Sequence, residues 1–216
     1  MTLTQIITAA RNKYNAIGDS FWSDAELLDL LYEGCLDLTK KVPDIIEAIY
    51  TTTSVASQQE YDFPTNTIKI KRITYAGKKL KPITMREDDS ITGLNQSSTS
   101  EGTPQYYFIW NNTISLRPIP STSSDSIKIY SLNEPAVLTI SSTLEIPTQF
   151  HMDLVNFILT GMCAKDSNAN MIVYYEKKWS EAVNEAKKWI KKIKRGDSFS
   201  VVQDEESIIE GYLGIV

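Results

Sequence analysis

Apolar residues near the start of the chain recur every three or four positions, which is the pattern of amphipathic helices. The first such segment predicts a helix over about 2–17, with Gly18 as its C-terminal stop. The next predicts a helix over 23–41, in which Ser23 and Glu26 have the spacing of a capping box. The apolar stripe of this second helix is interpreted as core, and it comprises Leu27, Leu30, Leu31, Cys35 and Leu38.

From about residue 48 to about residue 140, the period of the pattern falls to two. The segments there are short, rich in β-branched and aromatic residues, and separated by Gly, Pro, Asn and Ser, which predicts an antiparallel β region. Asn111 and Asn112 tolerate the positive φ of a tight hairpin turn, and Gly77 marks a second reversal. The apolar positions change parity along "NTIKIKRITYA", which predicts a bulge near Arg72.

A polar segment, "REDDSITGLNQSSTSEGTP", predicts a long exposed loop with one turn of helix near Asp88. The helical period then returns over 147–167, where Pro147 suits a first turn, and again over 170–195. The chain is therefore predicted to be α+β. The N- and C-terminal helices would form one bundle, with the β region inserted between them.

The last twenty residues, 197–216, differ from the rest of the chain. They carry five acidic and no basic residues, together with the apolar pairs Val201–Val202 and Ile208–Ile209 and an apolar end. Such a short segment cannot form its own core, yet it is too apolar for a simple solubilising tail. We expect residues 1–196 to form a single domain and 197–216 to form an extended arm that docks on a partner. A tail packed on its own subunit remains an alternative.

The net charge is −5, from 22 basic and 27 acidic residues, so the surface as a whole is not suited to binding polyanions. One stretch, "KKWIKKIKRG", departs from this balance at the end of the last predicted helix. The apolar positions of that helix follow helical steps from Tyr175 through Trp179 to Trp189 or Ile190 and then Ile193. We therefore expect the tryptophan and isoleucines to pack mainly inward and the lysines to face solvent. The basic residues are a candidate assembly surface: Lys187, Lys188, Lys191, Lys192, Lys194 and Arg195.

Residues for catalysis or metal binding are sparse. The chain has one histidine, no CxxC pair, no glycine-rich phosphate loop and no GxSxG motif, so we expect no metal, no cofactor and no enzymatic role. His151 and Cys163 would lie roughly 18 Å apart on one helix, which is too far for a base–nucleophile pair. His151 is interpreted as a satisfied or exposed helical histidine. Acidic neighbours such as Asp88 and Asp89 are interpreted as solvated charge.

The two cysteines, Cys35 and Cys163, lie in helix-like surroundings and are expected to be buried reduced thiols. The N-terminus lacks an apolar signal region, and no apolar run approaches the ~18 residues of a membrane span. The sequence therefore predicts a soluble protein that is synthesised in a cytoplasm.

Several segments together resemble the head-to-tail adaptor proteins of tailed phages, especially short-tailed ones. They are "FWSDAELLDLLYEGCLDL", "YDFPTNTIKIKRITYAGKKLKPIT", "GTPQYYFIWNNTISLRPIP", "IKIYSLNEPAVL", "LEIPTQFHMDLVNFILTGMCAKD" and "YYEKKWSEAVNEAKK". Each motif alone is weak, and their order carries most of the specificity. The resemblance covers roughly residues 20–190.

The resemblance implies a non-enzymatic virion protein that forms a ring, commonly of twelve subunits, below the portal. Such a ring holds the tail and leaves a channel for DNA. The implied partners are the portal protein, neighbouring copies and tail or nozzle proteins, with at most weak contact to DNA and none to a membrane. A C-terminal extension often reaches into the portal, which assigns docking contacts to Ile208, Ile209, Tyr212, Leu213 and Val216.

Two other functions compete with the adaptor hypothesis. The basic helix 187–195 with Trp189 would suit a nucleic-acid-binding module, whose affinity would fall steeply with salt. A polysaccharide-cleaving tail component would need two carboxylates held across a groove, and no motif supports it.

Overall fold

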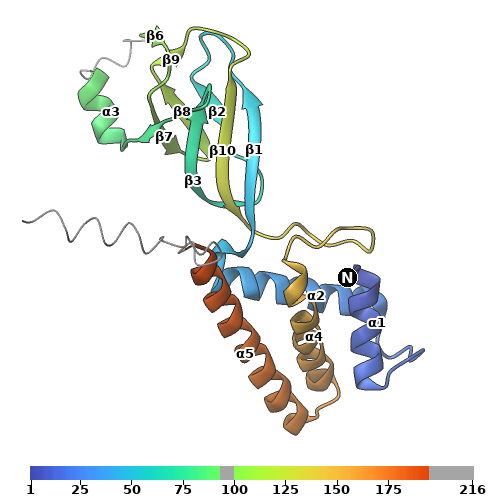
Figure 1. Ribbon diagram of the computed structural model, residues 1–216. Helices are drawn as coiled ribbons and strands as arrows, with labels where there is room; N and C mark the ends of the chain where they lie inside the picture. Colours follow the sequence, from blue (N-terminus) through green and yellow to red (C-terminus); the bar gives the residue numbers. More distant parts are fainter. Residues whose placement is uncertain (93–99, 195–216) are drawn as a thin grey trace, which may run out of the picture.

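The computed structural model describes residues 1–92 and 100–194, and it divides into a helical bundle and a β region (Figure 1). The helices are α1 (Leu3–Tyr14), α2 (Asp24–Lys41), the 3-10 helix η1 (Pro43–Ile45), α3 (Met85–Thr92), the 3-10 helix η2 (Thr148–Phe150), α4 (His151–Lys165) and α5 (Ala169–Lys194). The strands are β1 (Glu47–Thr53), β2 (Glu60–Asp62), β3 (Thr67–Tyr75), β4 (Lys78–Lys79), β5 (Lys81–Pro82), β6 (Glu101–Gly102), β7 (Tyr106–Trp110), β8 (Thr113–Arg117), β9 (Ile119–Pro120) and β10 (Ser126–Asn133). The α+β prediction is confirmed.

The bundle is formed by helices from both ends of the chain, with α4 packed against α1, α2 and α5 (Figure 1). The apolar stripe of α2 lies in its core, as predicted, although Leu30 is only partly buried. Glycine allows α2 and α4 to approach closely, because a Cβ added at Gly161 would come within 2.5 Å of Leu30 Cδ2. Likewise, a Cβ at Gly34 would meet the Phe157 ring at 3.0 Å.

The ends of the first two helices follow local capping rules with two corrections. Helix α1 ends at Tyr14 and not near 17, because Asn15 takes the left-handed conformation with φ 59°. Ile17 consequently lies outside the helix and is 75% exposed. Ser23 caps α2 as predicted, but the Glu26 carboxylate accepts a hydrogen bond from Lys165 at 2.7 Å instead of closing a capping box.

The β region has its own apolar core between two sheets. One sheet has the order β1-β10-β3-β4, and the other has the order β2-β8-β7-β5. The prediction of an antiparallel region holds for most pairs, but β5–β7 and β6–β9 are parallel. The β5–β7 pair arises because the chain passes directly from β4 through Leu80 into β5, and so crosses from one sheet to the other.

The predicted turns and bulge are confirmed. Asn111 and Asn112, with φ of 46° and 60°, close the β7–β8 hairpin, and Gly77 with φ 79° closes the β3–β4 reversal. Tyr130 pairs with Arg72 whereas Ser131 pairs with Ile70, so Lys71 is the extra residue of a bulge. The helix near Asp88 is longer than the single turn predicted, since α3 has eight residues.

The C-terminal helices lie close to their predicted ranges. The segment after Pro147 begins as the 3-10 helix η2 before α4, and α5 starts at Ala169. Among residues 1–92 and 100–194, none of the helices combines the length and apolar character needed to cross a membrane.

Candidate functional site

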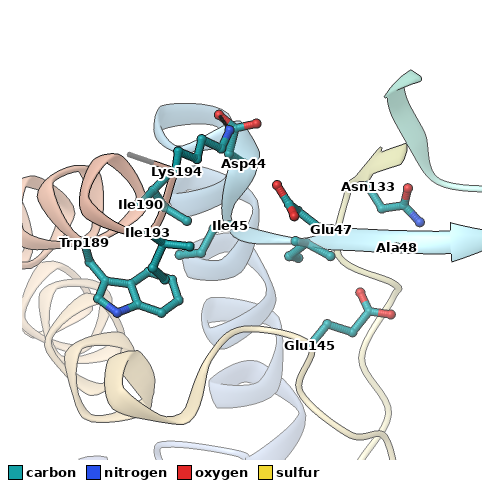
Figure 2. A pocket seen from close by; sticks show the side chains of 11 residues that line it. Asp44, Ile45, Glu47, Ala48, Asn133, Glu145, Trp189, Ile190, Ile193 and Lys194 are labelled. Carbon is teal, nitrogen blue, oxygen red and sulfur yellow. Dashed lines mark ion pairs between the residues drawn. The ribbon is translucent and has the colours of Figure 1, made fainter. Parts of the chain in front are cut away.

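The end of α5 meets the start of the β region at a junction pocket of about 370 Å³ (Figure 2). The chain leaves α2, turns through η1 and enters β1 directly, so η1 and β1 form one wall. The last described turns of α5 form another wall, and the segment between β10 and η2 contributes Glu145. The lining residues are Asp44, Ile45, Ile46, Glu47, Ala48, Asn133, Glu145, Trp189, Ile190, Ile193 and Lys194.

The apolar side of this pocket belongs to the bundle core. Ile45 and Ile190 are buried, and Trp189 packs edge-on against Phe150 with ring centroids 5.5 Å apart. Ile193 is 42% exposed at the mouth of the pocket. The prediction that the tryptophan and isoleucines of this helix pack inward is thus confirmed for Trp189 and Ile190, whereas Ile193 is largely left in solvent.

The polar side of the pocket is an ion-pair network. Lys71 contacts Asp44 at 3.2 Å and also pairs with Glu47, and Lys194 pairs with Asp44. Burial opposes ionisation of Asp44, but hydrogen bonds from Lys194 and Lys71 outweigh it and lower the pKa of this carboxyl. Burial likewise opposes the charge of Lys71, while its carboxylate partners raise its pKa overall. The network joins α5, η1 and β3 at one point.

The predicted basic surface divides into two parts. Lys187, Lys188, Lys191 and Lys192 are exposed, and none of them forms an ion pair with another described residue. Lys194 is instead held by Asp44 at the junction. Arg195 lies outside the described residues, as do the predicted docking contacts of the arm: Ile208, Ile209, Tyr212, Leu213 and Val216. The structure therefore leaves four lysines exposed near the end of α5, without an ion-pair partner among the described residues, and none of them lines the junction pocket.

His151 is a buried histidine whose ring nitrogens both form hydrogen bonds, which is one of the two alternatives predicted from the sequence. It is buried, and its Nε2 donates to the carbonyl of Ile146 at 2.7 Å. Its Nδ1 therefore accepts from the amino group of Met1, 3.2 Å away. Cys35 and Cys163 are buried free thiols, as predicted, and burial raises the pKa of Cys35 to about 12.

The interpretation of Asp88 as solvated charge is wrong. Asp88 is 5% exposed, and the Arg117 guanidinium donates to its carboxylate through Nε at 2.8 Å and Nη2 at 3.0 Å. The two residues are 29 positions apart, and only the packing of α3 against β8 brings them together. A single arginine at the end of an apolar strand, in "TISLRP", is the signal that could have indicated a buried ion pair.

Among the described residues, no group of three or more His, Cys, Asp or Glu side chains could hold a metal ion. The chain belongs to the SU10 adaptor protein family, whose family model matches residues 1–202. This is a family of phage head-to-tail adaptors, so the protein is a structural adaptor of a phage particle. A comparison with curated proteins found no match.

Proposed function

We propose that this adaptor binds the portal protein as a ring at the head–tail junction, joins the capsid to the tail, and leaves a channel for DNA. Family membership over residues 1–202 is the observation that carries the proposal. The ring would contain twelve copies, with tail or nozzle proteins bound on the side away from the portal. Residues 1–196 would act as a single adaptor domain without catalytic activity, and residues 197–216 as a docking arm.

The position of the arm in the chain supports its role. It starts three residues after Lys194, at the end of α5 that carries the four exposed lysines and lines the junction pocket. Its apolar residues are proposed to bind the portal: Ile208, Ile209, Tyr212, Leu213 and Val216. The basic surface is proposed to contact an acidic surface of the portal, or the acidic arm of its own or a neighbouring copy, because the arm carries five acidic residues.

Electron microscopy of the full chain mixed with the portal of the same phage tests this proposal. Wild-type protein should form a ring that caps the portal, whereas Ile208→Asp with Ile209→Asp should leave most portals bare. Ser207→Asp is the matched control, since it adds charge in the same segment without removing an apolar contact. Portals that stay bare with wild-type protein would refute the adaptor function as proposed.

The basic surface is tested separately with Lys187→Glu, Lys188→Glu, Lys191→Glu and Lys192→Glu in one chain. Portal binding should become weaker than for Lys177→Glu, an exposed lysine of the same helix outside the cluster. Equal portal binding by the fourfold variant and the control would show that these lysines are not part of the assembly surface.

A nucleic-acid-binding role is the second candidate, because the same four lysines are exposed and unpaired with other described residues next to Trp189. If all four contact phosphates, the logarithm of DNA affinity should fall against the logarithm of salt concentration with a slope of about −4. A titration of duplex DNA at low and moderate salt measures this slope. Undetectable binding at low salt would exclude the second role.

A further inference from the structure

The two sheets of the β region are joined on one side and open on the other. Beside β4 and β5 the chain crosses through Leu80 from one sheet to the other, which closes that side. On the opposite side, β1 and β2 are both edge strands, and a pocket of about 280 Å³ lies between them. We call this opening the seam; it is lined by Tyr50, Thr52, Thr53, Val55, Gln58, Glu60, Tyr61 and Asp62.

The β1 side of the seam has backbone groups without a strand partner. Ile46 accepts a bond from Asn133 and Ser54 donates to Asp125, both on the β10 side. Backbone groups of an antiparallel strand alternate in direction, so the even-numbered residues of β1 bond to β10. The odd-numbered residues, Glu47 to Thr53, therefore turn their N–H and C=O groups toward the seam.

The β2 side follows the same alternation. Gln59 accepts from Leu116 and Phe63 donates to Asn112, both toward β8. Glu60 and Asp62 consequently turn their backbone groups toward the seam. The Glu60 carbonyl accepts a hydrogen bond from Gln58 Nε2 at 2.8 Å, so a side chain of the same chain covers part of the β2 rim. Neither rim has a strand partner, and soluble proteins usually cover or protect such edges.

Side-chain exposure indicates that the seam is uncovered in the single chain. Tyr50 and its cross-strand partner Ile129 lie on the same face of their sheet. Ile129 is fully buried, whereas Tyr50 is 45% exposed. The core-facing side of this sheet is therefore exposed to solvent at the seam.

The charges on the two sides of the β region are complementary. Glu60 and Asp62 are exposed on the seam, and neither pairs with a basic group among the described residues. The closed side carries Lys78, Lys79 and Lys81, which are also exposed and without an ion pair in the described chain. We call these three lysines the ridge; Figure 1 shows β1 and β3, the partner of β4, on opposite sides of the sheet.

We propose that the seam of one copy binds the ridge of a second copy of this chain. A ring of identical subunits needs two different, complementary surfaces on each copy, and opposite edges of one domain can supply them. The ridge lysines would meet Glu60 and Asp62, and the arriving chain would cover Tyr50. This proposal deepens the proposed function and rests on it only for the ring, since contact between copies does not require the portal.

Charge reversal in the full chain tests the proposal, with sedimentation equilibrium as the measurement. A seam variant carries Glu60→Lys and Asp62→Lys, and a ridge variant carries Lys78→Glu, Lys79→Glu and Lys81→Glu. Each variant alone should self-associate at least about tenfold more weakly than wild type, because like charges then face each other. An equimolar mixture should regain association, since each surface again meets its opposite.

The control is Asp29→Lys with Glu33→Lys, which makes the same charge change on exposed residues of α2. It should associate like wild type. Carbodiimide cross-linking of isotopically heavy and light copies should also join ridge lysines to Glu60 or Asp62 of another copy. A wild-type chain that remains monomeric at millimolar concentration, or a mixture that does not regain association, would overturn the proposal.

Failure of this inference and failure of the proposed function can be told apart. If a seam variant binds the portal with wild-type affinity and self-associates normally, only the proposed seam–ridge contact is refuted. A wild-type chain that self-associates through these surfaces but does not bind the portal would refute the portal-binding function and still support the contact between copies.

Discussion

The carboxylate of Asp88 in α3 accepts two hydrogen bonds from the guanidinium of Arg117 in β8, at 2.8 and 3.0 Å. Both side chains are mostly buried, with 7% and 17% of their side-chain surface exposed. Because a mostly buried charge is stable only with its partner, this pair fixes α3 onto the sheet.

We expect Asp88→Ala to lower the free energy of unfolding by about 3 kcal/mol, since it leaves the Arg117 charge without its carboxylate. Urea unfolding of the variant and wild type measures the difference. Arg86→Ala, at an exposed position of the same helix, should change stability by less than about 0.5 kcal/mol. A loss no larger than that of the control would show that the pair does not stabilise the fold.

The bond between Trp179 and Asp37 ties α5 to α2 across the bundle. Trp179 Nε1 donates to Asp37 Oδ2 at 2.7 Å, and the indole also packs edge-on against Phe157. Trp179→Phe keeps an aromatic ring but removes the donor, so it should cost about 2 kcal/mol of unfolding free energy. The double variant with Asp37→Ala should cost less than the sum of the single changes, as measured by urea unfolding. Full additivity would contradict a direct coupling of the two residues.

Because of the junction network, the free energy of unfolding should depend on pH in the acidic range. The pKa of Asp44 is lower in the folded chain than the ordinary value of 3.8, so its contribution is complete above 3.8 and is lost as the pH falls through the folded pKa. Asp44→Asn should therefore be less stable than wild type at about pH 7, and the gap should be narrower at about pH 3, which lies below the ordinary pKa of 3.8. Urea midpoints at the two pH values measure the gap. A gap that stays constant with pH would show that the ionised carboxylate is not its source.

Both thiols should be inert while the chain is folded. Burial raises the pKa of Cys35 to about 12 and raises that of Cys163 as well, so neither forms thiolate near neutral pH. Ellman's reagent at about pH 8 should react with the folded protein only slowly, and with two thiols per chain after denaturation. Cys163→Ser, with one thiol after denaturation, identifies the slower group. A fast reaction of either thiol in the folded chain would mean that the bundle opens around it.

Features that depend on a few neighbouring residues could be read from the chain alone. Ser23 caps α2, the Asn111–Asn112 pair closes a hairpin, and the change of parity before Arg72 marks a bulge. Each is determined by the backbone preferences of one to four residues. The order of helix, β region and helix follows from hydrophobic period in the same way, and so does the α+β class.

The predictions that were wrong share a different cause. The apolar period extends α1 to Ile17, but Asn15 ends the helix first, and a single left-handed residue does not change the apolar period. The spacing of Ser23 and Glu26 predicts a local capping box, but the Glu26 carboxylate accepts a hydrogen bond from Lys165 on α4. In such cases a local partner competes with one that is distant in sequence.

The sequence by itself determined the periodic elements, their order, the acidic balance of the chain and the basic end of α5. Only the tertiary structure decided which charges are paired. Asp88 is buried with Arg117 and Lys194 with Asp44, whereas Lys187, Lys188, Lys191 and Lys192 remain free of described partners. The seam between β1 and β2 is likewise a product of sheet order. The physical reason is that charge pairing and open strand edges depend on distances across the fold, whereas periodicity reports only on the residues of one element.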